Sequence, residues 1–221
     1  MLEEKKIIEL KKELIEYATL VEGMIQKSIS GLQNKDRKIL LEVSEGDETL
    51  ANRLEIRLEE VCTNIIAQHQ PKGKSLRTLL MSLKINNDLE RMADYAVKIV
   101  ESSLFLIDQP QVKPYIDLPK LAEIAMEMVK DSVNAFVHED VALAQDVCER
   151  DNKADGRSAQ ILRDLKEFMS QDPFTIDRSL SLLRVAGSLE RIADLSTNIC
   201  EDVIYMVEGK VIKHHATNFR T

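Results

Sequence analysis

The chain has 221 residues, of which 44% are hydrophobic, and a formal net charge of −8 at pH 7. This balance allows a buried core and argues against nucleic acid as the main partner. Aromatic residues make up only 4%, Trp is absent, and there are 7 Gly and 5 Pro, a composition typical of long helices.

Apolar periodicity and helix-breaking residues predict six helices. Their approximate ranges are 3–32, 36–69, 75–107, 119–137, 140–169 and 175–209. Ser75 is expected to cap the third helix. The segment 108–119 holds three of the five prolines and is predicted to be a linker, and the polar tail 210–221 is expected to be loosely held.

A short segment of the chain occurs twice. Leu-Glu-Arg-Met-Ala-Asp at 89–94 returns as Leu-Glu-Arg-Ile-Ala-Asp at 189–194, an offset of 100 residues. Upstream, residues 32–36 and 43–47 match 136–140 and 147–151 at an offset of 104. Because short turns force antiparallel neighbours, we predict an all-α fold with two tandem similar three-helix bundles, each up-down-up, over residues 1–110 and 111–221.

The repeated acidic residues form a stripe on the last helix of each half. On a helical wheel Glu90, Asp94 and Glu101 gather nearly opposite the apolar side. Glu190, Asp194 and Glu201 do the same in the second copy. Residues four apart on a helix are neighbours, so their like charges repel, and keeping such a stripe twice carries a repeated cost.

The second helix of each half adds a carboxylate on its apolar stripe, Asp47 and Asp151. A buried carboxylate needs a cationic partner, a metal ion or a proton. If Asp47 leans toward Glu90 and Asp94, three carboxylates converge, and metal binding makes that favourable. The alternative is a solvated acidic face, with Arg91 and its repeat pairing with the acids.

Other sequence features bear on location and activity. No apolar run approaches the roughly 20 residues of a membrane span, and the charged N-terminus lacks the apolar stretch of a signal peptide. Cys62, Cys148 and Cys200 are not closely spaced, which indicates reduced, mostly structural thiols. We therefore expect a cytoplasmic protein. Gly-rich phosphate loops, nucleophile motifs and Glu-x-x-His motifs are absent from the sequence, and no enzymatic activity is expected.

Two helical halves, each with Glu-Arg-(Met/Ile)-Ala-Asp in the last helix, resemble the PhoU family of phosphate-uptake regulators. The resemblance covers essentially the whole chain. It implies an adaptor that acts with the ATPase subunit of the phosphate ABC transporter and with a sensor histidine kinase, and that represses the phosphate-starvation response. It also implies multinuclear iron or zinc clusters, which some family members bind through Glu(Asp)-x-x-x-Asp motifs.

Carried over residue by residue, the motif falls on three pairs in this chain, with one departure: Ala51 follows Asp47 where a second acid is expected. The first-half metal ligands are then Asp47, Glu90, Asp94 and Glu101. The second-half ligands are Asp151, Asp155, Glu190, Asp194 and Glu201. Because the affinity for hard cations rises with the number of carboxylates, we predict that the second half is the better metal site.

Three functional classes remain open from the sequence. The first is a regulatory adaptor without enzymatic activity, the second a metal-storage or metal-sensing protein, and the third a carboxylate-metal hydrolase. Long bundles with little aromatic core leave apolar stripes for a partner, so a homodimer is also expected.

Overall fold

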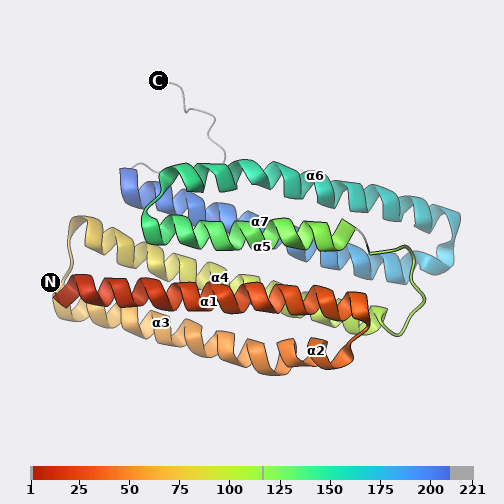
Figure 1. The fold of residues 1–221 in the computed structure, drawn as a ribbon, viewed down its shortest axis with the longest axis horizontal. Coiled ribbons are helices and arrows are strands. Elements are labelled where there is room, and N and C mark those ends of the chain that lie inside the picture. Colours follow the sequence, from red (N-terminus) through yellow and green to blue (C-terminus); the bar gives the residue numbers. More distant parts are fainter. Residues whose placement is uncertain (1, 116, 210–221) are drawn as a thin grey trace, which may run out of the picture.

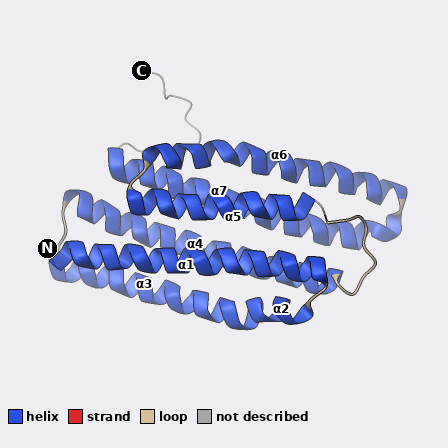
Figure 2. Ribbon diagram, viewed as in Figure 1, coloured by secondary structure: helices blue, strands red, loops and turns tan. Residues whose placement is uncertain are grey.

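The computed structural model describes residues 2–115 and 117–209, so the predicted tail 210–221 lies outside the described residues. The helices are α1 (Leu2–Asn34), α2 (Arg37–Glu42), α3 (Glu48–His69), α4 (Gly73–Leu106), α5 (Asp117–His138), α6 (Val141–Gln171) and α7 (Ile176–Glu208). A π-helical turn, η1 (Val43–Asp47), joins α2 to α3, and a 3-10 turn, η2 (Pro173–Thr175), precedes α7. The described residues contain no strand (Figure 2), which confirms the all-α prediction.

The helices form two similar bundles that lie side by side (Figure 1). Helices α1 to α4 make the first, in which α2, η1 and α3 run on as one rod, and α5 to α7 make the second. The bundles meet where α4 packs on α7 and α1 packs on α5, while α3 and α6 lie at the outer edges. The predicted pair of tandem three-helix bundles is confirmed.

The turn after the first helix is the same in both bundles. Lys35 and Glu139 adopt positive φ angles of 54° and 57°. The next residues, Asp36 and Asp140, donate their backbone N–H groups to carbonyls five residues earlier, each at 2.9 Å. Their side chains then accept hydrogen bonds from the first turn of the following helix. These hydrogen bonds end one helix and cap the start of the next, so residues 32–36 and 136–140 encode the same chain reversal in both bundles.

The start of α4 differs from the sequence prediction. The helix begins at Gly73, and Lys72 occupies the capping position without a side-chain hydrogen bond. The prediction that Ser75 caps this helix was therefore wrong, because Ser75 lies inside the first turn. Elsewhere among the described residues, no helix combines the length and the apolar character that a membrane crossing requires.

The π-helical turn η1 changes the register between the two bundles. Before the turn, buried positions correspond at an offset of 104, as for Leu40 and Ala144. After it they correspond at 103, as for Leu58 and Ile161. A π turn accommodates one extra residue, which rotates the rest of the rod by about one residue position. The apolar side chains return to the core after this insertion, and every polar position beyond it is shifted.

This shift corrects the alignment of the motif positions. Ala51 corresponds to Ala154, and both are fully buried in the core. The residue that corresponds to Asp155 is therefore Asn52, which is exposed like Asp155. One turn further on, Glu55 corresponds to Ser158. The first bundle still lacks an acid at the position of Asp155, but the residue that occupies this position is Asn52 and not Ala51.

Candidate metal centre

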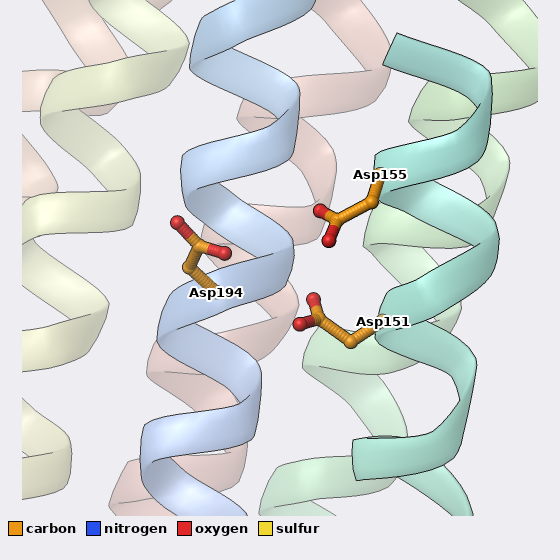
Figure 3. Close-up of side chains that lie close together, drawn as sticks. All are labelled: Asp151, Asp155 and Asp194. Atoms are coloured by element: carbon orange, nitrogen blue, oxygen red, sulfur yellow. The ribbon is translucent and has the colours of Figure 1, made fainter. Parts of the chain in front are cut away.

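Three aspartates converge between α6 and α7. One carboxylate oxygen from each of Asp151, Asp155 and Asp194 lies within 4.8 Å of the other two. Figure 3 shows Asp151 and Asp155 projecting from α6 toward α7, which carries Asp194. Ligands at 2.3–2.6 Å from a cation lie at most about 5 Å apart, so these oxygens fit around one ion. Asp151 is buried, Asp194 is half-buried and Asp155 is exposed, which leaves the centre open on one side.

Two neighbouring hydrogen bonds position the α7 side of this cluster. Arg191 donates to Asp194 at 2.8 Å and supplies a positive charge next to the three acids. Ser158 donates to Glu190, the other acid of the predicted motif on α7. Glu190 therefore lies next to the trio but is held by a hydroxyl from α6. It can support the ligands or replace one after rotation of its side chain.

A groove of about 930 Å³ between α4 and α7 opens beside the cluster. Asp151, Asp194 and Glu201 line it from the second bundle, and Arg91 lines it from the first. The predicted ligand Glu201 therefore faces the same groove as two members of the trio. Its counterpart Glu101 lines a separate hollow of about 530 Å³ further along the two helices.

Charged side chains bridge the groove between the two bundles. Lys84 on α4 forms an ion pair with Asp202 on α7, and Arg91 donates to Asp88 at 3.3 Å. Burial raises the pKa of Asp88 to about 6, although Arg91 and Lys84 act in the opposite direction. Of these contacts, the Lys84–Asp202 ion pair links α4 to α7 next to the acidic cluster, and Asp88 titrates just below neutral pH.

The first bundle uses its acids differently. Asp47 accepts hydrogen bonds from Lys27 of α1 at 3.0 and 3.3 Å, so this stripe carboxylate has a cationic partner. The position of Lys27 in the second bundle is occupied by Asp131, which pairs instead with Arg150 at 2.6 Å. The structure thus pairs Asp47 with a lysine, whereas it places Asp151 beside two further aspartates.

Glu90 and Asp94 lie on α4 near Glu55 of α3 and the phenol of Tyr17 on α1. Burial and the charges of Asp94 and Glu55 raise the pKa of Glu90. These acids are more widely spaced than those of the second bundle. Among the described residues, only the Asp151, Asp155 and Asp194 group meets the 4.8 Å spacing.

The PhoU domain matches this chain twice, over residues 14–103 and 118–203. The chain belongs to the PhoU domain family. A PhoU homolog from Aquifex aeolicus, described as a phosphate-specific transport system accessory protein, is 38% identical over 210 residues, or 95% of each chain. PhoU from Escherichia coli K12, with the same description, is 33% identical over 195 residues, or 88% of this chain and 80% of that protein. The crystal structure of PhoU from Pseudomonas aeruginosa, at 29% identity, covers 94% of this chain and 99% of that one with a TM-score of 0.89.

Sequence reasoning missed four polar residues around the acids of the two PhoU repeats. These are Tyr17, Lys27 and Glu55 in the first repeat and Ser158 in the second. The change of offset from 104 to 103 was the signal that could have found Glu55 and Ser158, because it is visible in the apolar pattern of the second helix. Nothing in the local pattern around Tyr17 distinguishes it from a core aromatic residue.

Proposed function

We propose that this protein is an accessory regulator of phosphate uptake that represses the phosphate-starvation response when phosphate is plentiful. The observation that carries the proposal is the pair of PhoU repeats, over residues 14–103 and 118–203. Support comes from relatives that are described as accessory proteins of the phosphate-specific transport system and that align along most of their length. The long, charged helical faces suit an adaptor rather than an enzyme.

The proposed partners are the ATPase subunit of the phosphate ABC transporter and a sensor histidine kinase, bound by a homodimer of this protein in the cytoplasm. The groove between α4 and α7 supports this, because it presents charges from both repeats on one face. Arg91 and Arg191 line it, and about half or more of each side chain is exposed, so they can form ion pairs with a partner.

Co-purification tests the partner proposal. The tagged protein is isolated with membranes from phosphate-replete cells that express the transporter, and the ATPase subunit is quantified. We expect the Arg91→Glu, Arg191→Glu double variant to lose the subunit. The matched control, Arg53→Glu with Arg163→Glu, makes the same charge change at exposed positions of α3 and α6 and should retain it. Failure of the unmodified protein to capture the subunit, or to restore repression in cells lacking their own PhoU, refutes the proposal.

We also propose that the second repeat binds a transition metal through Asp151, Asp155 and Asp194, with Glu190 and Glu201 nearby. The three oxygens fit one ion, and an all-oxygen set suits iron better than zinc, which prefers nitrogen and sulfur. A bound ion would neutralise the three acids and link α6 to α7. The same cluster favours metal storage or sensing as the alternative function. Tight stoichiometric iron in a protein that captures no transporter subunit would support that alternative.

A further inference from the structure

Two of the three cysteines meet across the second bundle. Cys148 lies on α6 and Cys200 on α7, and the Cys200 thiol donates a hydrogen bond to the sulfur of Cys148. Both are free thiols in this structure. The third cysteine, Cys62, is buried on α3 in the other bundle. The spacing of the cysteines along the sequence does not reveal this pair, because the contact depends on how α6 packs on α7.

The packing of α6 on α7 places the two thiols at the same level along the bundle. The helices run antiparallel (Figure 1), and Ser158 of α6 donates a hydrogen bond to Glu190 of α7. Cys148 precedes Ser158 by ten residues, and Cys200 follows Glu190 by ten residues. Cys148 also lies seven residues before Asp155, and therefore on the face of α6 that is turned toward α7 (Figure 3).

The first repeat has no such pair. The sequence positions that match Cys148 and Cys200 are Ser44, at an offset of 104, and Val100, at an offset of 100. Val100 is fully buried, like Cys200. Packing at this position of the core is therefore satisfied by an apolar side chain and does not require a thiol. The contact between two thiols is a feature that the second repeat has in addition to its packing.

The two thiols differ in their access to solvent. Cys148 is half-buried, whereas Cys200 is fully buried. The hydrogen bond from Cys200 lowers the pKa of Cys148, against burial and the charges of Glu201 and Asp151. Redox-sensitive cysteines are accessible to solvent and lie next to a second cysteine that resolves the first oxidation product. Cys148 is therefore the thiol that an oxidant reaches first, and Cys200 is placed to resolve it.

We propose that Cys148 and Cys200 form a reversible disulfide that cross-links α6 to α7 when the protein meets a peroxide. The Cys148 thiolate attacks one oxygen of hydrogen peroxide, the O–O bond breaks, and the released hydroxide takes up the proton that Cys148 lost. The Cys200 sulfur then attacks the sulfenic acid on Cys148, the S–O bond breaks, and the departing hydroxide leaves as water with the Cys200 proton. Two thiols are oxidised to one disulfide, and one peroxide is reduced to two waters.

The disulfide ties α6 to α7 three residues before Asp151, next to the aspartate cluster. Two molecules of a small thiol reverse the reaction by thiol–disulfide exchange and become a disulfide themselves. This inference is independent of the proposed function in phosphate uptake.

Peptide mapping tests the cross-link in the full-length protein, which is reduced, freed of reductant and treated with hydrogen peroxide. Remaining thiols are blocked with iodoacetamide before digestion with trypsin. We expect the tryptic peptides 131–150 and 192–210, each of which holds one cysteine, to appear as one linked species. The oxidised protein should still migrate as a monomer on a non-reducing gel, and dithiothreitol should separate the peptides. It should also unfold at a higher urea concentration than the reduced protein, because the link restricts the unfolded chain.

Three variants separate the pair from the other thiol. Cys62→Ser is the matched control and should form the link as the parent does. Cys148→Ser should lose both the linked peptides and the oxidation-dependent shift in urea. Cys200→Val introduces the residue type of the first repeat, and it should leave Cys148 as a sulfenic acid that dimedone traps. Circular dichroism checks that each variant folds.

Three outcomes would overturn the proposal. The first is a parent protein that yields no linked peptides after peroxide treatment, or that forms disulfides between molecules instead. The second is a loss of the link in Cys62→Ser or its persistence in Cys148→Ser. The third is equal labelling of Cys148 by dimedone in the parent and in Cys200→Val, because Cys200 then does not resolve the oxidised sulfur.

Discussion

Replacing Asp194 by Asn is expected to change the stability of the protein in opposite directions with and without metal. The substitution keeps the shape of the side chain and removes one of three charges whose oxygens lie within 4.8 Å of each other. At that distance two unit charges repel by about 0.9 kcal/mol in water and about 3.5 kcal/mol at an effective dielectric constant of 20. Asp155 is exposed, so the lower end of this range applies to its pair.

Two pairs are relieved in the metal-free variant, and because Asp151 is buried they give about 2–4 kcal/mol in favour of the folded state. The lost contact with Arg191 offsets about 0.5 kcal/mol, because that ion pair is mostly exposed. The metal-free Asp194→Asn variant should therefore unfold at a higher urea concentration than the parent. With metal, the parent gains binding energy that the variant lacks, and the order reverses. Losing one carboxylate ligand should weaken binding about tenfold or more.

Urea unfolding in chelator and in excess Mn²⁺, which carboxylates bind well, measures both signs, and metal analysis gives the affinity. Glu149→Gln is the matched control, since it removes an exposed carboxylate of α6 outside the trio and should have the same small effect in both buffers. If Asp194→Asn shifts the unfolding midpoint equally with and without Mn²⁺, the cluster does not bind metal and the reasoning is refuted.

Two further predictions concern the helix contacts. Burial raises the pKa of Asp88 to about 6, so between about pH 4 and pH 6 the native state holds a proton that the unfolded chain has lost. The free energy of unfolding should therefore fall by about 2–3 kcal/mol as the pH rises through this range. Urea unfolding at several pH values should show that Asp88→Asn removes most of this dependence of stability on pH. A Cβ on Gly31 would lie 2.7 Å from the side chain of Leu40, so Gly31→Ala should cost about 1–3 kcal/mol. The second repeat has Ala135 and Ala144 at these positions, so two alanines fit together there. A double-mutant cycle should therefore show that Leu40→Ala lowers the free energy of unfolding less when Gly31→Ala is also present. If the two losses of stability simply add, the steric argument is contradicted.

The helices and their pairing into repeats followed from the sequence because they depend on local signals. Apolar periodicity placed the rods within a few residues of their ends, and the matched runs at 32–36 and 136–140 encode the same capped reversal in both halves. The exception was Ser75, because helix start signals compete within one turn and Gly73 begins α4 earlier. The chain segment alone does not settle which polar residue becomes the cap.

The candidate site was predicted in part. Asp194 on the repeated stripe and Asp151 on the apolar stripe do meet, with Asp155, between α6 and α7. The sequence left open whether Asp47 would meet Glu90 on the adjacent helix, and in the structure Asp47 pairs with Lys27 of α1. A helical wheel gives the face on which a side chain lies and not the neighbour that it meets, so the partner of each acid depended on which helices pack together.

The sequence by itself determined the all-helical class, the two repeats and the acidic residues on them, because each follows from composition or from the period of one helix. Only the tertiary structure decided which acids converge. The π-helical turn η1 shifts α3 by one residue position, which places Asn52 where the second rod has Asp155 and Glu55 where it has Ser158. The second rod has no such turn in its described residues, so Asp151 and Asp155 both reach Asp194. One extra residue in a helix does not change the composition noticeably, but it rotates every later side chain about the helix axis. It therefore changes which residues can act as ligands at that surface.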